Sequence, residues 1–530
     1  MHIGGLRTAL MNKLFAVQNS GVFVLRIEDT DQNRCVKEAF DDILNSLKWA
    51  GISADEGPLS TGKHGPYIQS ERKAVYVAVA KSLVGSGLAY PCFCSHDRLE
   101  LLRNEQRRRG ETPRYDNRCR NVPHVTALSR MNSGEPHTIR FKVPNQRTTV
   151  SDVVFGEVTF ETQDTEGDFI ILKSDGMPVY HLANVVDDHF MEITHVIRGV
   201  EWLSSTPKHL LLYQALHWPI PQFAHLPLLL SSSGGKLSKR DPEFAQVGQV
   251  RNLIATGFLP SAVLTWLSSV GFGANSASQG TDASSVKQAG HHWSPTLQFS
   301  DLVSQFSLTR IRRQNVTISP DLLRICNRVH FNLMAEQAMT ELSNPKNSED
   351  YKTPELVSRV RDYLESNLPG SHFNSSHDLD ADRTLAEKLL LLKGRITCFS
   401  DLISAESGLR FLWLKPEPGA CASKILSLIE SSSIGLDDVV LLLNECIGVL
   451  SLPPSDDLTK HVKSVCHRLR IGQHIAMRIL RLGLTEHEVG PPVVEIFRLL
   501  SPYEAISRLR ATIDEIDRIT KTPLCNEFDS

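Results

Sequence analysis

Two short segments, far apart in the chain, carry side chains that suit phosphate chemistry. His2-Ile3-Gly4-Gly5 precedes a run with helical spacing, and Lys236-Leu237-Ser238-Lys239-Arg240 follows a stretch of serines and glycines. A helix that begins at small residues offers free amide N–H groups and a positive dipole end to a phosphate, and a nearby imidazole adds a donor. Two lysines on a loop can close over a polyphosphate as charge develops on the leaving group. Each segment alone also fits an exposed turn or a solvated basic loop.

Two further segments place charged and aromatic side chains where a small polar molecule can bind. Glu28 and Asp29 follow an apolar run over 22–27 that we interpret as a buried strand. Open α/β sheets bind ligands at the carboxyl ends of their strands, and an acidic cluster there can hold an ammonium group. The second segment adds residues that can orient a carboxylate and a nucleoside: Tyr180, Arg198, Glu201 and Trp202. Taken singly, helix-capping acids, a buried tyrosine and surface ion pairs explain them equally well.

The elements that must position these residues alternate between strand and helix patterns. Apolar residues at helical spacing predict helices over 39–49 and 72–88, and a mixed segment with strand-like alternation follows them. From residue 178 the alternation of strands and helices resumes. We interpret these short runs as strands: 185–186, 195–197 and 225–230. Two α/β halves around an insert predict one doubly wound, Rossmann-type parallel sheet, whereas helical periodicity dominates beyond about residue 300.

Composition narrows the class of protein. The chain has 530 residues, of which 41% are apolar and 22% charged, so it can form several packed cores and is not a disordered or fibrous protein. Its 57 basic and 60 acidic residues give a net charge of −3, so any nucleic acid must bind to local basic patches. Ten scattered cysteines favour a reducing compartment. No apolar run approaches the roughly 18 residues of a membrane span.

In this order, the segments resemble the bacterial-type glutamyl-tRNA synthetases, which are class I enzymes with a Rossmann core. Tyr67-Ile68-Gln69-Ser70-Glu71-Arg72 and the run from Asp187 to Gly199 belong to the same resemblance, which covers residues 1 to about 335. It implies a glutamate–tRNA ligase that uses ATP with Mg²⁺ to form glutamyl-adenylate and then charges tRNA-Glu. Charging of tRNA-Gln is left open. The implied partners are thus tRNA, ATP and L-glutamate, and we expect a monomer.

The resemblance also assigns roles to individual residues. For glutamate binding it implies Glu28, Tyr180, Asn184 and Arg198. For ATP binding it implies His2, Gly4, Glu201, Trp202, Lys236 and Lys239, of which His2, Lys236 and Lys239 are the catalytic set. For the tRNA acceptor stem, an arginine-rich segment supplies Arg107, Arg108, Arg109 and Arg114. Neither chemical step requires a protein nucleophile, so catalysis rests on positioning and charge stabilisation.

The domain division that follows has five parts. We expect a first half of the Rossmann core over 1–90, an α+β acceptor-stem insert over 91–178, and the second half of the core over 179–240. A helical linker region over 241–318 and a mainly α-helical anticodon-binding region over 319–530 complete it. In the family a strand carrying Arg-Phe-Ala-Pro-Ser-Pro-Thr-Gly precedes the His-Ile-Gly-Gly segment. Because this chain begins after that strand, we expect a truncated chain that lacks the first strand of the active site.

Three cysteines are spaced like a zinc site that some family members carry. Cys92, Cys94 and Cys119 can supply three thiolates, but Asn121 stands where the family has a histidine ligand, and His124 can replace it only if the loop allows. We therefore expect reduced cysteines and no bound zinc.

Three other functions fit parts of the sequence. A glutaminyl-tRNA synthetase reads anticodons with β-barrels, but strand alternation is missing from residues 320–530. A tRNA-modifying glutamyl transferase normally lacks a C-terminal domain. A tRNA-binding protein without catalysis fits the expected truncation. The segment 114–121 is similar to the mitochondrial branch of the family, so we expect the mitochondrial matrix, with the cytoplasm as the alternative.

Overall fold

The computed structural model describes two compact units. It describes residues 1–31, 37–60, 62–161, 167–235, 237, 242–270, 294–343, 352–368, 378–430, 432, 434–451 and 458–521. One unit comprises Met1–Ala255 with Pro260–Cys326, and the other Thr256–Leu259 with Asn327–Ser530. The division thus falls close to the boundary expected at residue 319, while the five-part division stays a prediction. Among the described residues, no helix is both long enough and apolar enough to cross a membrane.

A four-stranded sheet in the first unit confirms the predicted parallel core. Its strand order is β4-β3-β7-β6. The strands are β3 (Thr148–Asp152), β4 (Gly156–Phe160), β6 (His195–Gly199) and β7 (Gln222–Leu226). Strand β7 pairs in parallel with both β3 and β6, and β4 runs antiparallel to β3 at the edge. The sheet therefore includes two strands, β3 and β4, that the sequence interpretation had assigned to the insert over 91–178.

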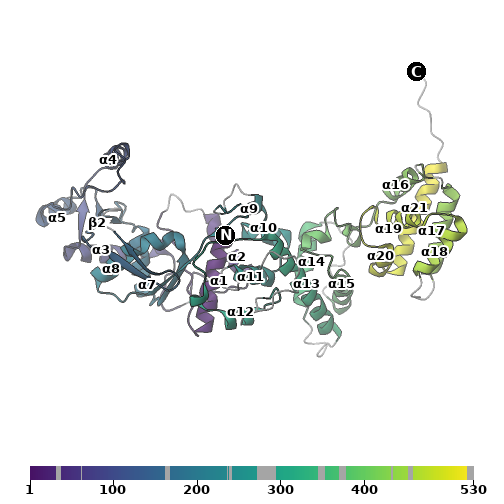
Figure 1. Cartoon of the computed structure of the whole chain (residues 1–530), viewed down its shortest axis with the longest axis horizontal. Helices are drawn as coiled ribbons and strands as arrows, with labels where there is room; N and C mark the ends of the chain where they lie inside the picture. The colour runs from purple at the N-terminus through teal and green to yellow at the C-terminus, as the bar shows by residue number, and fades with distance from the viewer. Residues whose placement is uncertain are drawn as a thin grey trace, which may run out of the picture. The chain divides into compact units, whose positions relative to one another are not determined.

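Helices α7 (Tyr180–Phe190) and α8 (Thr206–Leu216) pack with this sheet (Figure 1). Leu182, Val185 and Val186 of α7 share one buried cluster with Leu212 of α8 and Phe223 of β7. The prediction of a strand over 185–186 is thus wrong. The reason is periodicity, because apolar residues at 182, 185 and 186 repeat at helical spacing and give the helix one buried face.

Helix α1 (Ile3–Gln18) opens the first unit. Ile3, Leu6, Leu10 and Leu14 lie on one face and are 0% exposed. The remaining elements of the core and its C-terminal part are α2 (Lys37–Trp49), α3 (Lys73–Gly85), β8 (Leu229–Leu230), α9 (Pro242–Val247), α10 (Val250–Thr256), α11 (Pro260–Ser269), α12 (Phe299–Gln305) and β9 (Val316–Thr317). Helix α13 (Pro320–Ser343) begins in the first unit.

The segment expected to form a buried strand over 22–27 forms no ladder. Val24 makes a single parallel bridge to Glu56, and Ile27 makes another to Ile68. Val22 is 59% exposed. The segment is extended, but each bridge goes to a different neighbour, so the expectation of a regular buried strand here is wrong.

A separate three-stranded antiparallel sheet forms the inserted module. Its order is β1-β2-β5, from β1 (Ala89–Cys92), β2 (Thr138–Phe141) and β5 (Ile170–Leu172). Helices α4 (His96–Arg108) and α5 (His124–Asn132) accompany it (Figure 1). Ser95 caps helix α4, because its side chain accepts from the amide of Arg98, and the helix has no buried residue. Leu99 packs against the buried cluster of Tyr90, Cys92, Tyr115 and Cys119, while the exposed faces of the helix remain available to another molecule or to water.

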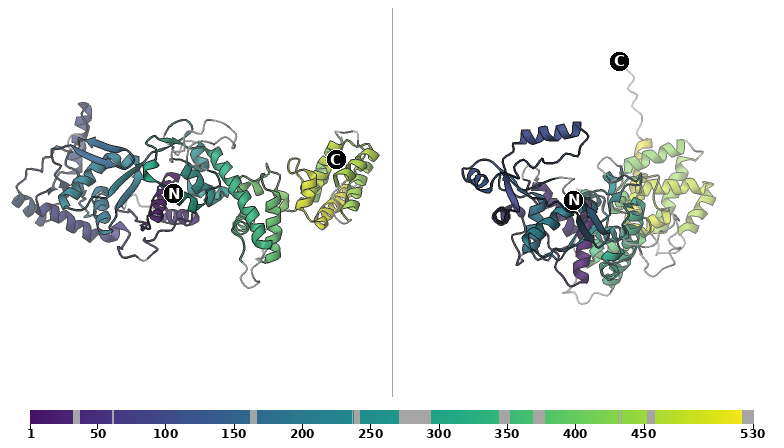
Figure 2. Two further views of the ribbon diagram at one scale, coloured as in Figure 1. Left: turned by 60° about the horizontal axis from the view of Figure 1, so that its bottom comes forward. Right: turned by 60° about the vertical axis from the view of Figure 1, so that its left-hand side comes forward.

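The second unit is helical, as predicted, and its described residues contain no strand. Its helices are α14 (Glu355–Asn367), α15 (Leu379–Leu391), α16 (Pro418–Glu430), α17 (Leu436–Leu450), α18 (Leu458–Leu469), α19 (Gln473–Thr485), α20 (Val493–Leu499) and α21 (Pro502–Lys521). The last six, coloured green to yellow, form one bundle in both views of Figure 2. Leu443, Leu480 and Leu509 from three of these helices are 0% exposed.

Two loops of the second unit approach each other at glycines. Gly408 has φ +64° and Gly490 has φ +156°. A Cβ atom on Gly408 would lie 2.1 Å from the carbonyl oxygen of Val489. Both the backbone conformation and the close contact therefore require glycine at position 408.

Candidate active site

The start of α1 is capped by a side chain from its own segment. The Gly4 amide donates to His2 Nδ1 at 2.9 Å, and a Cβ on Gly4 would lie only 3.1 Å from that nitrogen. The amides of Gly5 and Leu6 donate to the His2 carbonyl, and the Ile3 amide donates to Gly248. The expectation of free amides here is therefore wrong, since the chain itself satisfies them. The helix dipole remains as the feature that favours an anion.

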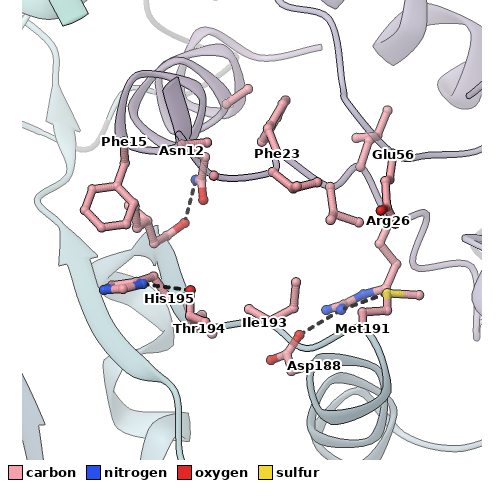
Figure 3. Close-up of a pocket in the computed structure, with 18 of the residues that line it drawn as sticks. Asn12, Phe15, Phe23, Arg26, Glu56, Asp188, Met191, Ile193, Thr194 and His195 are labelled. Atoms are coloured by element: carbon pink, nitrogen blue, oxygen red, sulfur yellow. Dashed lines mark hydrogen bonds and ion pairs between the residues drawn. The ribbon is translucent and has the colours of Figure 1, made fainter. Parts of the chain in front are cut away.

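A groove of about 800 Å³ runs beside α1. In Figure 3 the labelled side chains of α1, such as Asn12 and Phe15, and of residues 191–195 surround the open space. Gly5, near the start of α1, lines it, and so does Glu28. The groove therefore connects the helix end expected to bind ATP with the acid expected to bind glutamate.

Arg26 holds the acidic end of this groove together. Its Nη1 donates to Asp188 Oδ1 at 2.7 Å, and its Nη2 donates to Glu28 Oε1 at 3.2 Å. The Glu28 side chain keeps 38% of its surface exposed. Loss of hydration around its carboxyl nevertheless raises the pKa of Glu28, against the attraction of Arg26. Arg26 was not assigned a role from the sequence, although it lies two residues from a predicted site residue.

Asp187 lies behind these groups and organises them. It is 0% exposed and accepts hydrogen bonds from Gln69 Nε2 at 2.9 Å, Arg72 Nε at 2.7 Å and the Tyr76 hydroxyl at 2.8 Å. The predicted site residue Asn184 is buried and accepts from Gln69 at 3.5 Å. A fully bonded buried carboxylate fixes the loops from which Arg26 and Gln69 extend.

Tyr180, Arg198 and Trp202 lie together, from α7, β6 and the 3₁₀ helix η2 (Val200–Ser205), while their roles in binding stay predictions. Arg198 Nη1 donates to the Tyr180 hydroxyl at 3.1 Å, and the Tyr180 and Trp202 ring centroids are 4.3 Å apart. Burial raises the pKa of Tyr180 to about 12, so it stays protonated; Arg198 opposes this shift and Glu28 adds to it. The carboxylate of Glu201 lies close to Gly199, where a Cβ would be 2.2 Å from Glu201 Oε2.

Comparison with known families decides what this arrangement belongs to. The family model described as "tRNA synthetases class I (E and Q), catalytic domain" matches residues 1–295. The chain belongs to the class I tRNA synthetases of the glutamyl and glutaminyl type. A second model, described as "Anticodon binding domain", matches residues 355–513 of this synthetase, within its second unit.

Individual relatives of the synthetase agree with the family match. A glutamate–tRNA ligase from Finegoldia magna is 38% identical over an alignment of 385 residues, which covers 69% of this chain and 74% of that protein. One from Alkaliphilus metalliredigens is 39% identical over 378 residues, covering 69% and 71%. The crystal structure of a glutamate tRNA ligase from Elizabethkingia meningosepticum, in complex with its amino acid, superposes with a TM-score of 0.71 at 29% identity, covering 97% of both chains. The family resemblance drawn from the motifs is thus confirmed.

Most of the other predicted residues do not line the groove. Tyr180, Asn184, Arg198, Glu201 and Trp202 belong to the same unit but are not among the residues that surround this space. Lys236 and Lys239 lie outside the residues that the structure describes. In the insert of the synthetase, Arg107, Arg108, Arg109 and Arg114 are exposed on and after α4. Arg109 forms an ion pair with Glu105, one helical turn away. The exposed set forms a local basic surface, although the contact with tRNA itself stays a prediction.

The three cysteines of the insert lie together. One sulfur atom from each of Cys92, Cys94 and Cys119 lies within 4.8 Å of the others. The Tyr115 hydroxyl is 3.3 Å from Cys92 Sγ and 3.5 Å from Cys94 Sγ. Three sulfur atoms fit three positions of a tetrahedral zinc site. The sequence-based expectation of no zinc stays a prediction, and one zinc per purified chain would contradict it.

Proposed function

We propose that this chain is a glutamate–tRNA ligase that activates glutamate with ATP and charges tRNA-Glu. The observation that carries the proposal is the placement of Arg198 and Tyr180 near Glu28. Arg26 donates to Glu28 and to Asp188 of α7, the helix that also carries Tyr180, whose hydroxyl accepts from Arg198. A cationic fork and an anionic group at one site match a substrate with a carboxylate side chain and an ammonium group.

In both chemical steps, the enzyme has to position the substrates and to stabilise the charge that develops on them. An oxygen of the glutamate α-carboxylate attacks the α-phosphorus of ATP, which arrives with Mg²⁺, and pyrophosphate leaves. The terminal ribose 2′-hydroxyl of tRNA then attacks the carbonyl carbon of the adenylate, and AMP leaves. Arg198 and Tyr180 are suited to hold the side-chain carboxylate, and Glu28 to hold the ammonium group. No step requires a covalent bond to the protein.

Aminoacylation with labelled glutamate tests this proposal. We expect the purified chain to charge tRNA-Glu in the presence of ATP, and pyrophosphate exchange, measured with and without tRNA, to depend on glutamate. Glutamine in place of glutamate should give no product. Charging with glutamine alone would indicate the glutaminyl enzyme, and tRNA binding without charging would indicate a binding protein. The same assay with purified tRNA-Gln decides whether that tRNA is a second substrate.

We also propose that the enzyme works as a monomer in the mitochondrial matrix. The similarity of residues 114–121 to the mitochondrial branch of the family supports the compartment. Light scattering of the purified chain tests the first proposal, and a dimeric mass would contradict it. Fractionation of cells with an antibody to the chain tests the second, and recovery in the cytoplasm alone would contradict it.

A further inference from the structure

A line of three buried side chains crosses the parallel sheet behind Tyr180. Asp152 ends β3, His225 lies on β7, and Arg198 lies on β6 directly opposite His225 in the strand register. His225 Nδ1 is 2.6 Å from Asp152 Oδ2, and Arg198 Nε donates to His225 Nε2 at 3.2 Å. The exposed fractions are 4% for Asp152, 0% for His225 and 9% for Arg198. The sequence analysis gives no role to Asp152 or His225, although the segment Phe223-Ala224-His225-Leu226-Pro227 belongs to the family resemblance.

The donors and acceptors of this line fix the protonation of His225. Arginine Nε is only a donor, so His225 Nε2 must accept from Arg198. The ring proton then resides on Nδ1, which donates to the Asp152 carboxylate. Burial lowers the pKa of His225, which favours the neutral ring. The carboxylate stays charged because the bonds from His225 and the Phe155 amide outweigh its own burial and lower the pKa of Asp152.

Both ends of the line are anchored. Asp152 Oδ1 accepts from the amides of Val154 at 2.9 Å and Phe155 at 2.8 Å, so the backbone holds the carboxylate. At the other end, Arg198 Nη2 donates to Thr206 Oγ1 at 2.9 Å and to the Trp202 carbonyl at 3.4 Å. Nη1 donates to the Tyr180 hydroxyl at 3.1 Å and lies 3.5 Å from His209 Nδ1. A substrate carboxylate that binds Arg198 at its Nη1 edge therefore has to replace or share one of these contacts.

We propose that Asp152 and His225 are positioning residues that hold Arg198 in the orientation needed to bind the side-chain carboxylate of the substrate. The proposal rests on the proposed function for the role of Arg198. Asp152 sets the ring tautomer of His225, and the tautomer provides the acceptor that fixes Arg198 Nε. Neither residue touches the substrate.

The variant Asp152→Asn tests the tautomer directly because it keeps the shape of the side chain. Asparagine retains one oxygen for the amides of Val154 and Phe155, but it presents an NH₂ group to His225. The ring must then accept at Nδ1 and carry its proton on Nε2, where it opposes the Arg198 Nε–H. We expect the KM for glutamate to rise about 10-fold, the scale of one lost buried hydrogen bond. The thermal midpoint should also fall, because a buried donor loses its acceptor. The KM for ATP should change little, whereas a purely structural role would raise the KM values for both substrates together.

The variant His225→Gln provides the matched control. A glutamine oxygen can accept from Arg198 without any tautomer, so the KM for glutamate should rise less than in Asp152→Asn. In this background, the further change Asp152→Asn should have little effect. Two additive increases in KM would overturn the proposal, because they would show that Asp152 does not act through His225.

A measurement that does not use activity separates this proposal from the proposed function. ¹⁵N-histidine NMR at neutral pH should show His225, assigned by its absence in His225→Gln, with a protonated Nδ1 and an unprotonated Nε2. Asp152→Asn should reverse the two nitrogens. A proton on Nε2 in the wild-type chain would overturn the proposal even if charging is normal. Failure of the wild-type chain to charge glutamate, with the expected tautomer in place, would instead overturn the proposed function.

Discussion

At the scale of single residues, the site is built from charged groups that already have partners. Arg26 contacts Asp188 and Glu28, and Arg72 contacts the buried Asp187. Breaking one partner of such a buried pair leaves an uncompensated charge, which is strongly destabilising. Substitutions at the site therefore need to preserve shape and charge if they are to report on binding rather than on folding.

The variant Arg198→Lys preserves the charge and changes only the shape of the donor group. Lysine keeps the positive charge but cannot reproduce the planar fork that contacts His225, Tyr180 and Thr206. We expect kcat/KM for glutamate to fall about 100-fold, with the KM for ATP within a factor of two, in the aminoacylation assay. Equal losses for both substrates would show that Arg198 supports the fold rather than the amino-acid site.

Two histidines beside the site, the half-buried His181 and the buried His209, predict a pH-dependent stability. Burial, followed by the charges of Lys208 and Arg198, lowers the pKa of His181 to about 3, and burial lowers that of His209 well below its ordinary value. In the unfolded chain, each of these histidines is protonated with the ordinary pKa of about 6.5. The stability is therefore complete above pH 6.5 and is lost as the pH falls toward 3, because the unfolded state binds more protons in this window. The slope approaches about 1.4 kcal/mol per pH unit for each such histidine.

Calorimetry of wild type and His181→Phe between pH 7 and pH 5 measures this effect. We expect the thermal midpoint of the wild type to fall more than that of the variant over this range. His217→Asn serves as the control, because His217 is exposed in the left-handed C-cap of α8, where asparagine is tolerated. A variant that loses as much stability as the wild type on acidification would contradict the assignment.

At the scale of elements, the sequence predicted helices better than it predicted strands. It did not predict hydrogen bonds between side chains that lie far apart in the chain. The apolar spacing of 39–49 and the C-terminal segments indicated helices that the structure contains. The prediction of a strand over 185–186 was wrong because two adjacent β-branched residues fit either a strand or the buried face of a helix. Contacts such as Asp152 with His225, 73 residues apart, leave no local pattern, so no periodicity could reveal them.

Two variants of His2 can separate its structural role, as the cap of α1, from a chemical role in ATP binding. Replacement by alanine removes the acceptor for the Gly4 amide, and we expect a loss of about 1 kcal/mol in the free energy of unfolding of the first unit. His2→Asn restores a good capping side chain and should recover most of that stability. If the imidazole also contacts ATP, both variants should raise the KM for ATP. Full recovery of this KM in His2→Asn would show that His2 acts only as a cap.

At the scale of the whole molecule, near-neutral charge conceals a local basic surface. The net charge is −3, yet the exposed arginines on and after α4 are concentrated within the insert. Composition alone could therefore not reveal an RNA partner, whereas the local run of arginines could. The helix that carries them buries no residue within the chain.

Salt dependence measures how many of these arginines contact phosphates. We expect the triple variant of Arg107, Arg108 and Arg109 to alanine to weaken tRNA binding and to reduce the slope of log affinity against log salt by about 2. The KM values for glutamate and ATP should not change. Arg147→Ala, next to β3, is a control that removes an exposed, ion-paired arginine away from α4. An unchanged slope in the triple variant would place the tRNA contacts elsewhere.

The contact at Gly408 has a consequence for inherited variation. Any side chain at this position would collide with the carbonyl of Val489, so a substitution would push the two loops of the second unit apart without touching the groove. A loss of about 1–2 kcal/mol in folding stability can change the cellular amount of a protein several-fold through chaperones and proteases. An allele altered at Gly408 should therefore lower the steady-state level of the chain, while each surviving molecule activates its amino acid at the normal rate. Its phenotype would result from a reduced amount of the enzyme, so higher expression or a lower growth temperature should correct it.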